Sequence, residues 1–487
     1  MADQTTARIL VASNRGPVSF STAADGSLTL RRGGGGLVSG LSAIDDPNAV
    51  WVCAALGDAD RAAARSAPDG RLDLAGFDVG GQAVRMLDID PEVFDQAYNG
   101  VANSTLWFIH HMLYDTPTAP AFDQESADRW AGFRAYNAAF AEALAAEAAP
   151  GAAVLVQDYH LSLVPELLRE LRPDLRIGYF LHIPWAPADY FRLLPDEWAV
   201  AVLTGVLGAD RAGFHSRRWA EAFADCCERV LDATVDRAAL TVGYRGRTTR
   251  LGVHALGADA EFLRERAHRP DVEERLAGLR EAVGQGDSGP RRTVVRVDRT
   301  ELSKNIVRGL QAYRHLLRTR PEWHDRVVHI AFAYPSRQDL AEYREYTAAV
   351  RRLSEEINAE FGTERWQPLI LQVEDDFARS LAAYRLADVA LVNPIRDGMN
   401  LVAKEVPVVS DAGCALVLSR EAGAWAELAE DAIGVNPYDV LGTAEALHRA
   451  LTLPAAERTE RTKRLAAAAT ALPPQQWFLD QLAALSS

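Results

Sequence analysis

The densest group of residues suited to chemistry in this chain runs from residue 394 to residue 405, with the sequence PIRDGMNLVAKE. It holds a guanidinium, two carboxylates and a flexible glycine. The apolar run directly before it predicts a buried strand, so Asp397 and Gly398 follow the strand's carboxyl end, where open α/β sheets bind ligands. Residues 399–405 predict a short helix that Pro407 stops, and its first backbone N–H groups suit a phosphate.

Cations follow three other predicted strands. Arg15 and Arg337 each stand near a strand's carboxyl end, where a guanidinium can bind phosphate bidentately. Arg299 and Lys304 flank a strand-to-helix turn, and the helix that follows is predicted over 302–317, with Lys304 in its first turn. Each positive charge within ~4 Å of a diphosphate contributes on the order of 4 kcal/mol at an effective dielectric constant of about 20, before desolvation is subtracted. A solvated helix start is the plain alternative, but the helix macrodipole mildly disfavours cations there, which favours an anionic ligand.

Three further features have both a functional and a plain structural interpretation. The glycines at 33–36 let the backbone approach a phosphate, or they form a flexible hairpin tip. Asp158, Tyr159 and His160 follow one predicted strand, and His182 follows the next. A lone histidine at such a place is more often a hydrogen-bonded structural residue. The two strands are expected to be close together in the sheet order, so the polar groups at their ends favour a ligand-binding site.

The length and the pattern of the chain predict two α/β domains. Its 487 residues, 48% of them hydrophobic, are too many for one core. Short apolar runs alternate with longer amphipathic segments, which is the pattern of parallel sheets. The composition changes at 267–292 before a new strand begins, and we place the domain boundary just before this change, near residue 258.

Charge and cysteine content limit the partners and the compartment. The net charge of −15, with both signs scattered, argues against a nucleic-acid partner. Four cysteines without CxxC or His-rich spacing predict neither a disulfide framework nor a zinc site, so we expect a reducing, cytoplasmic location. The N-terminus does not have the basic and apolar regions of a signal peptide, and no apolar run approaches membrane-spanning length. We therefore expect no membrane partner.

Taken together, these motifs resemble those of the trehalose-6-phosphate synthases, which are retaining GT-B glycosyltransferases of family 20. The resemblance extends from Ser13 to about Tyr438. It implies two Rossmann-like parallel-sheet domains that face a central cleft. An acceptor-binding domain would span 1–257 and a donor-binding domain 258–473, with a C-terminal helix at 474–487 that crosses back to the first domain. The most specific motifs are residues 13–15, 158–161, 180–184 and 396–405, supported by 435–439.

The resemblance also implies a reaction and residue roles. Glucose would pass, with retention, from GDP-glucose or UDP-glucose to glucose 6-phosphate. Arg15 and Arg337 would hold the acceptor's phosphate, and Arg299 with Lys304 would clamp the donor's diphosphate. The implied catalytic set comprises Asp158, His182, Arg299, Lys304 and Asp397, the acceptor set Arg15, Tyr98, Trp107, Tyr159 and Arg337, and the donor set Gly35, Gly36, Arg299, Lys304, Phe377, Asp397, Gly398, Met399, Asn400, Leu401, Val402 and Glu405.

The implied mechanism needs no metal and no cofactor, because two cations and backbone N–H groups would neutralise the leaving diphosphate. No side chain stands out as a covalent nucleophile. The resemblance therefore favours same-face attack, in which the departing phosphate takes the proton of the acceptor hydroxyl. His182 and Asp397 would hold the donor's glucose hydroxyls, and Glu405 its ribose. The expected partners are small-molecule substrates, and the oligomeric state stays open, with a homo-oligomer as one alternative.

Three departures from the family's pattern bear on the donor and the reaction. Residues 301–305 read Glu-Leu-Ser-Lys-Asn, where many members carry Asp-Tyr-Ser-Lys-Gly. The base-contacting region at 372–377 keeps an aromatic ring at Phe377 but is unusually acidic. Because carboxylates accept the N–H groups that guanine offers, we hypothesise that GDP-glucose serves as well as UDP-glucose, or better. Pro407 is expected to shorten the helix after Glu405.

Two alternatives stay open. A pseudoglycosyltransferase of the validoxylamine 7'-phosphate synthase type would couple cyclitols instead of sugars, and Asn305 favours it, whereas residues 397–405 favour glucosyl transfer. A catalytically silent sugar-phosphate sensor is the alternative outside enzymes. It predicts the loss of a cation from the diphosphate clamp, yet Arg299, Lys304 and Arg337 are all present.

Overall fold

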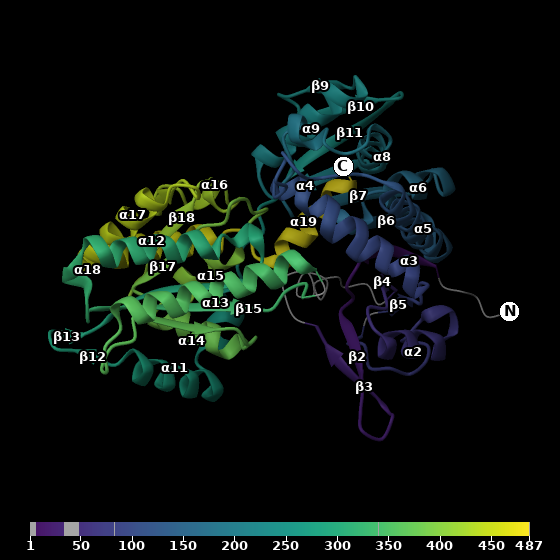
Figure 1. Cartoon of the computed structure of the whole chain (residues 1–487). Helices are drawn as coiled ribbons and strands as arrows, with labels where there is room; N and C mark the ends of the chain where they lie inside the picture. The colour runs from purple at the N-terminus through teal and green to yellow at the C-terminus, as the bar shows by residue number, and fades with distance from the viewer. Residues whose placement is uncertain (1–5, 34–47, 82, 339, 487) are drawn as a thin grey trace. The chain divides into compact units, whose positions relative to one another are not determined.

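Two compact units make up the chain. The computed structural model describes residues 6–33, 48–81, 83–338 and 340–486. Unit 1 comprises Met1–Leu256 and Pro474–Ser487, and unit 2 comprises Gly257–Pro473. Each unit has a largely parallel sheet with helices packed on it (Figure 1). The apolar runs that predicted strands are indeed strands in both units.

The sheet of unit 1 has the strand order of a Rossmann fold. Along the sheet the strands are β5 (Ala83–Leu87), β4 (Val50–Ala54), β1 (Ala7–Ser13), β6 (Ala148–Gln157), β7 (Arg176–Leu181), β8 (Arg211–Phe214), β11 (Arg247–Val253), β10 (Thr241–Tyr244) and β9 (Thr234–Asp236). The chain builds outward from β1 through β4 to β5, then returns to the other side of β1 with β6, β7 and β8, in parallel pairing throughout. The reversal between β1 and β6 is the switch point, where such sheets bind ligands.

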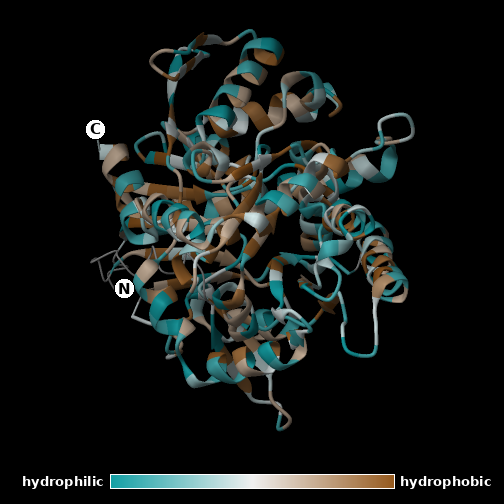
Figure 2. Cartoon of the chain, turned by 90° about the vertical axis from the view of Figure 1, so that its left-hand side faces the viewer, coloured by the Kyte–Doolittle hydropathy of each residue, from teal (hydrophilic) through white to brown (hydrophobic). Residues whose placement is uncertain are grey.

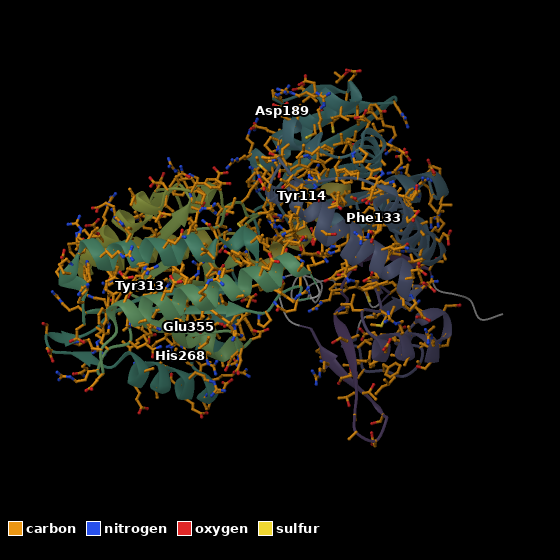
Figure 3. All side chains as sticks on the ribbon, viewed as in Figure 1. Tyr114, Phe133, Asp189, His268, Tyr313 and Glu355 are labelled. Atoms are coloured by element: carbon orange, nitrogen blue, oxygen red, sulfur yellow. The ribbon has the colours of Figure 1, made fainter. Side chains whose placement is uncertain are left out.

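Helices connect most of these strands, and a hairpin outside the sheet follows β1. The hairpin consists of β2 (Val18–Thr22) and β3 (Leu28–Arg32), paired antiparallel. Phe133, on the longest of the helices, is 0% exposed and marks the core of unit 1 (Figure 3). The helices are α2 (Asp58–Ser66), α3 (Pro91–Asp95), the π-helix η2 (Gln96–Leu106), α4 (Trp107–His111), α5 (Gln124–Glu147), α6 (Val164–Leu171), α7 (Ala188–Phe191), α8 (Asp196–Leu207) and α9 (Arg217–Leu231).

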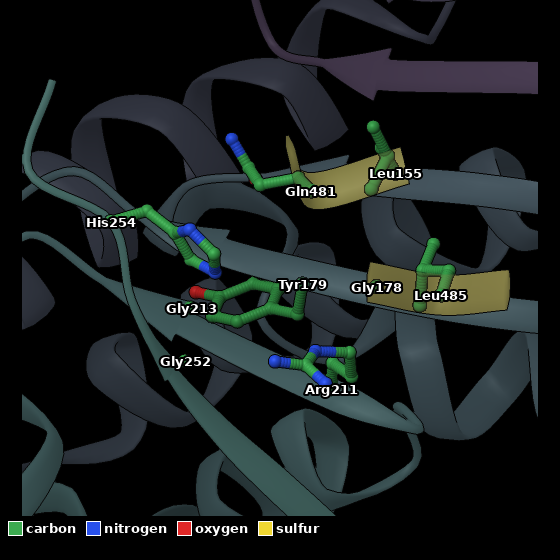
Figure 4. A pocket seen from close by; sticks show the side chains of 9 residues that line it. All are labelled: Leu155, Gly178, Tyr179, Arg211, Gly213, Gly252, His254, Gln481 and Leu485. Atoms are coloured by element: carbon green, nitrogen blue, oxygen red, sulfur yellow. The ribbon is translucent and has the colours of Figure 1, made fainter. Parts of the chain in front are cut away.

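The C-terminal helix α19 (Pro474–Ser486) packs within unit 1. Trp477 is 0% exposed, and its indole Nε1 donates a hydrogen bond to the carbonyl oxygen of His254 at 2.9 Å. A cavity of about 20 Å³ lies beside this helix, lined in part by Tyr179, Arg211 and Gln481 (Figure 4). Since a buried water needs roughly 10–15 Å³, the cavity has room for water but not for a sugar.

Unit 2 repeats the Rossmann order on a second sheet. Along the sheet the strands are β16 (Leu369–Gln372), β15 (Val327–Tyr334), β14 (Arg292–Arg299), β17 (Val389–Val392), β18 (Ala415–Ser419) and β19 (Ile433–Val435). All neighbours pair parallel, and the strand order reverses between β14 and β17. The residues of β15 and β17 are buried throughout, as expected for strands covered on both faces. The switch point therefore lies at the carboxyl ends of β14 and β17.

The helices of unit 2 lie around this sheet, and hydropathy separates the two layers: the strands are hydrophobic and the outer helix faces polar (Figure 2). Tyr313, on the helix after β14, is 0% exposed in this core (Figure 3). The helices are α10 (Ala260–Ala267), α11 (Pro270–Val283), α12 (Ile306–Thr319), α13 (Ala341–Phe361), α14 (Phe377–Leu386), α15 (Leu401–Val409), α16 (Trp425–Leu428), α17 (Val440–Thr452) and α18 (Ala455–Ala469).

Two local expectations were wrong. Helix α15 starts at Leu401, not at residue 399, and runs through Pro407 to Val409. Pro407 removes one helical hydrogen bond, at a cost of about 3 kcal/mol. The helix continues because residues 406–409 are all buried, so their packing offsets that cost. Pro407 therefore does not shorten the helix after Glu405.

The second correction concerns Lys304, which was expected in the first turn of a helix over 302–317. It lies instead in a short 3-10 turn, Leu302–Lys304, and α12 begins only at Ile306. Asn305 separates the two with a left-handed backbone, φ 58°. Asn is one of the few residues that tolerate this conformation, which glycine otherwise supplies. The replacement of the family's glycine by Asn305 is thus compatible with the backbone.

Candidate functional site

The switch point of unit 2 joins two loops that are distant in sequence. The Lys304 ammonium Nζ lies 2.6 Å from Asp397 Oδ2, across 93 positions of the chain. The two side chains are 16% and 15% exposed. Burial acts to lower the pKa of Lys304, but Asp397, Asp298 and Glu301 outweigh it and hold that pKa above its ordinary value. The ammonium therefore stays charged.

The loop that carries Asp397 is held on two sides. The Asn400 amide donates to Asp397 Oδ2 at 3.1 Å, and its own Oδ1 caps α15 by accepting the N–H of Ala403 at 3.1 Å. On the other side, the N–H of Gly423 donates to the Asp397 carbonyl at 3.0 Å. A Cβ at Gly423 would collide with the carbonyl oxygen of Gly398, so this position requires glycine. Sequence reasoning missed Gly423, because no periodic pattern marks it.

The first turn of α15 supplies backbone donors, and the next turn supplies one carboxylate. Leu401 and Val402 are half-buried at the start of the helix, and Met399 just before it is 4% exposed. Glu405 follows one turn later and accepts a hydrogen bond from the hydroxyl of Tyr384 at 3.4 Å. Burial raises the pKa of Glu405 to about 7, although the Tyr384 bond opposes the shift. Glu405 thus titrates near neutral pH.

The ends of β14 and β15 add two arginines around one buried carboxylate. Glu301 is 0% exposed, and its Oε1 lies 3.2 Å from Arg299 Nε and 3.4 Å from Arg337 Nη1. Ser336 Oγ donates to the same oxygen at 2.9 Å. The structure therefore brings Arg299, Lys304, Arg337 and Asp397 into one region of unit 2, as expected from their strand ends. Sequence reasoning treated Glu301 only as a departure from the family's pattern.

The acidic region after β16 is only partly available to a ligand. Asp376 caps α14 by accepting the N–H of Arg379 at 2.9 Å, and it pairs with Arg275 at 2.8 Å. Glu374 and Asp375 are exposed. Phe377 is 44% exposed and stacks on a neighbouring ring with the planes 13° apart. One of the three carboxylates is thus committed to structure, and two remain beside the exposed ring.

The switch point of unit 1 gathers a second set of predicted residues. Arg15 is exposed just beyond β1. Asp158 follows β6 with φ 74° and accepts the backbone N–H of His182 at 3.3 Å. His182 Nε2 lies 2.9 Å from Gln157 Oε1, an arrangement that puts the ring proton on Nε2 and leaves Nδ1 as an acceptor. Burial lowers the pKa of His182 to about 4, so the ring is neutral at physiological pH.

Aromatic rings from the π-helix η2 and from α4 meet the loop after β6. Tyr98 stacks on His160 with 5.6 Å between ring centroids, and Trp107 lies 5.8 Å from Tyr159. The Tyr159 hydroxyl donates to the fully buried Asn103 Oδ1 at 2.7 Å. The structure thus brings Tyr98, Trp107 and Tyr159 together, although 61 positions separate the first from the last. A π-helix widens the helix locally and often occurs at functional sites.

Two predicted donor residues, Gly35 and Gly36, lie outside the described residues. Gln157 and Asn103, which orient His182 and Tyr159, were not predicted, because each acts through a contact distant in sequence. Among the residues that the structure describes, no three His, Cys, Asp or Glu side chains form a group that could hold a metal ion. Over the same ranges, every helix is too short or too polar to cross a membrane.

Two Rossmann-type units, each with charged and polar side chains at its switch point, define a glycosyltransferase of the GT-B class. The family model for glycosyltransferase family 20 matches residues 7–487, and the chain belongs to this family.

Relatives and solved structures agree with this assignment. The trehalose-6-phosphate synthase of Mycobacterium avium (strain 104) is 36% identical over 489 residues, 97% of this chain and 95% of that protein. The bifunctional trehalose-6-phosphate synthase/phosphatase of Thermoproteus tenax is 35% identical over 467 residues, which cover 94% of this chain but only 60% of that protein. The crystal structure of a UDP-forming α,α-trehalose-phosphate synthase from Burkholderia vietnamiensis superposes with a TM-score of 0.82 at 31% identity, over 99% of this chain and 100% of that one.

Proposed function

We propose that this protein is an α,α-trehalose-6-phosphate synthase, which transfers glucose from a nucleoside-diphosphate glucose to glucose 6-phosphate with retention. The observation that carries the proposal is the Lys304–Asp397 pair at the switch point of unit 2, with Nζ and Oδ2 2.6 Å apart. Its ammonium provides positive charge for a diphosphate, and its carboxylate accepts hydroxyl groups of a sugar. Membership of family 20 supports the same reaction.

Residues of unit 2 are proposed to hold the donor. Arg299 and Lys304 stabilise the diphosphate, the backbone of Leu401 and Val402 binds phosphate at the start of α15, and Glu405 takes the ribose. Support comes from the charge of Lys304 and from the nine-residue length of α15, whose first N–H groups carry partial positive charge. The Gly398 to Asn400 segment completes the donor set, together with Asp397 for the glucose and Phe377 for the base.

Residues of unit 1 are proposed to hold the acceptor and the transferred sugar. Arg15 is proposed to bind the acceptor's phosphate, a role proposed for Arg337 as well, and the rings of Tyr98, Trp107 and Tyr159 pack on its glucose. His182 accepts a donor hydroxyl through Nδ1, consistent with a neutral ring, and Asp158 fixes the His182 backbone.

In the proposed reaction the bond from the donor's C1 to the diphosphate oxygen breaks as the bond to the acceptor's oxygen forms on the same face. The acceptor proton passes to the departing phosphate. This course needs no protein base, which agrees with the low pKa of His182, about 4, set by its burial. The cations then stabilise the charge that develops on the diphosphate.

The test is a donor profile. The purified protein is incubated with glucose 6-phosphate and UDP-glucose, GDP-glucose or ADP-glucose in turn. Mass spectrometry detects the phosphorylated disaccharide, and NMR of the glycosidic linkage reports retention. Reactions without glucose 6-phosphate control for hydrolysis of the donor. If none of the three donors yields the disaccharide, the proposal is wrong.

For the donor base we propose that GDP-glucose serves as well as UDP-glucose, or better. The support is the pair of exposed carboxylates, Glu374 and Asp375, beside the exposed ring of Phe377. Asp376 is not counted, because it caps a helix and pairs with Arg275. Comparing kcat/KM for the two donors decides the question, and a strong preference for UDP-glucose contradicts the proposal.

The cyclitol-coupling alternative loses its main support. Asn305 is 2% exposed, and its amide donates to the carbonyl oxygens of Asn393 and Pro437 at 3.0 and 2.7 Å. Asn305 therefore has a structural role, and its presence is no sign of an altered substrate. The sensor alternative would be supported only if calorimetry showed that both substrates bind and no product formed.

We also propose a cytoplasmic location. All four cysteines are free and buried: Cys53, Cys226, Cys227 and Cys414. Unpaired cysteines are the rule in reducing compartments. Both proposed substrates are small anionic metabolites, which the basic groups at the two switch points suit in spite of the net charge of −15.

We expect the Arg15→Ala variant to raise the KM for glucose 6-phosphate. Losing a charge-assisted contact to the phosphate should raise it by roughly 10- to 100-fold. The variant should change kcat little, because the phosphate is remote from the reacting carbon. Steady-state kinetics at saturating donor measure this, with Arg8→Ala, an exposed arginine at the other end of β1, as the control. An equal rise in the donor's KM contradicts the assignment.

We expect donor use to depend on the ionisation of Glu405. Because burial raises its pKa to about 7, the carboxylate that would accept two ribose hydroxyls is protonated below that pH. At saturating glucose 6-phosphate, kcat/KM for the donor should therefore fall about tenfold per pH unit below about pH 7. A pH profile measures this. The Glu405→Gln variant should have a lower kcat/KM that does not fall further below pH 7. If the variant shows the same fall as the wild type, another group causes it.

A further inference from the structure

One carboxylate oxygen in unit 2 contacts two arginines, and in the proposed function these arginines bind different phosphates. Glu301 Oε1 lies within 3.2 Å of Arg299 Nε and 3.4 Å of Arg337 Nη1, and Ser336 Oγ donates to it at 2.9 Å. The Glu301 side chain is 0% exposed, whereas that of Arg299 is 56% exposed and that of Arg337 11%. Glu301 thus lies behind both guanidinium groups, away from solvent, while Arg299 remains accessible.

The charge on Glu301 is retained in spite of its burial. Burial acts to raise its pKa, but Arg299, Arg337 and Lys304 lower it to about 2. Among the described residues, its second oxygen, Oε2, is buried and accepts no hydrogen bond. A buried ion pair of this kind is often no more stable than an apolar replacement. Stability alone therefore does not account for an ionised group here.

Arg337 adds a second observation. Its backbone is left-handed, φ 45°, a conformation that an arginine rarely adopts and that is typical of functional sites. Its Nη1 has two partners, since it lies 3.4 Å from Glu301 Oε1 and donates to the hydroxyl of Tyr343 at 3.1 Å. The guanidinium is therefore fixed before any ligand arrives.

We propose that Glu301 is a positioning residue, which orients Arg299 toward the donor's diphosphate and Arg337 toward the acceptor's phosphate. This inference rests on the proposed function. Glu301 touches neither substrate and acts through the two guanidinium groups. One oxygen that binds both fixes the spacing of the two phosphate contacts, and with it the distance between the reacting groups. Preorganised charges of this kind stabilise the transition state without a cost of reorganisation.

The distinguishing variant is Glu301→Gln, which keeps the shape and removes the charge. Both arginines keep their own charge, so attraction of the substrates' phosphates persists, and the two KM values should change less than about threefold. Turnover should fall roughly 10- to 100-fold, because misplacement by about 1 Å has that effect. Glu301→Asp keeps the charge on a shorter side chain and should recover about tenfold of the loss. Ser336→Ala, which removes one hydrogen bond to Oε1, should lower kcat about fivefold.

Asp388→Asn is the matched control. Asp388 Oδ1 also bridges two arginines, Arg292 at 2.6 Å and Arg458 at 3.3 Å, but it lies just before the amino end of β17, whereas the switch point lies at the carboxyl ends of the strands. The control should keep wild-type kcat and KM. Thermal unfolding of every variant separates loss of turnover from loss of fold.

Each outcome either supports or overturns the positioning role of Glu301. A Glu301→Gln variant that keeps kcat within about threefold of wild type, or a control that loses as much turnover, overturns the positioning role. So does a loss that appears only as raised KM. If Glu301→Gln does not fold, unchanged turnover in both Glu301→Asp and Ser336→Ala overturns it. A wild-type protein without product overturns the proposed function as well, whereas an active wild type with an equally active variant overturns only this inference.

Discussion

Replacing Lys304 by alanine is expected to lower kcat by about 10²–10³-fold, the usual effect of removing one preorganised charge from a developing anion. The ammonium stays protonated, because Asp397, Asp298 and Glu301 outweigh the effect of burial on its pKa. In the proposed function it therefore offers a full positive charge to the departing diphosphate. The KM for glucose 6-phosphate should change little, since the charge matters most when the donor bond breaks.

The control for this variant is Lys463→Ala, which removes another lysine–carboxylate pair of unit 2, 2.7 Å long, on the outer helix α18. Its turnover should match the wild type. Lys304→Ala should also unfold more readily by about 3 kcal/mol, because it removes the cation that pairs with the largely buried Asp397. Thermal unfolding shows whether enough folded protein remains to interpret kcat. Raised KM with unchanged kcat would make Lys304 a binding residue only.

Replacing Asp397 by asparagine is expected to lower kcat/KM for the donor by about 10²–10³-fold. Asparagine has the same shape but does not carry the charge that, in the proposed function, accepts the donor's hydroxyls. It also loses the ion pair with Lys304, leaving the ammonium with Asp298 and Glu301 as its carboxylate neighbours. Kinetics with the donor varied at saturating glucose 6-phosphate measure the effect.

Asp431→Asn is the matched control for Asp397. Both carboxylate side chains are 15% exposed, and both lie 2.6 Å from a cation, Asp431 from Arg464. Only Asp397→Asn should lower kcat/KM for the donor. Because Asp397 and Lys304 act as a pair, the double variant should lose less than the product of the two single losses. Fully additive losses would show that the two residues act independently.

Much of the fold was predictable because strand periodicity is a local property. The apolar runs that predicted β1, β7, β14 and β17 are strands. Arg15 and Asp397 follow the carboxyl ends of β1 and β17, and Arg299 is the last residue of β14. The strand order of each sheet was not predictable in this way. It arises from pairing between segments that are distant in the chain, and it determines which strand ends share a switch point.

The errors came where tertiary contacts override local rules. Pro407 predicts the end of a helix, yet the burial of residues 406–409 carries α15 through it. A helix was expected across Lys304, but Asn305 holds a left-handed backbone through bonds to the carbonyls of Asn393 and Pro437. In both places the backbone conformation depends on contacts with residues that are distant in sequence, which helix propensity does not describe.

By itself, the sequence determined the family and the residue types at the strand ends, because motifs such as residues 396–405 are continuous in the chain. Only the tertiary structure decided how those residues are held. Lys304 meets Asp397 across 93 positions, Tyr159 meets Asn103 across 56, and Glu301 joins Arg299 to Arg337. Such contacts depend on how the chain folds back on itself, and they set the charge, orientation and pKa of each group.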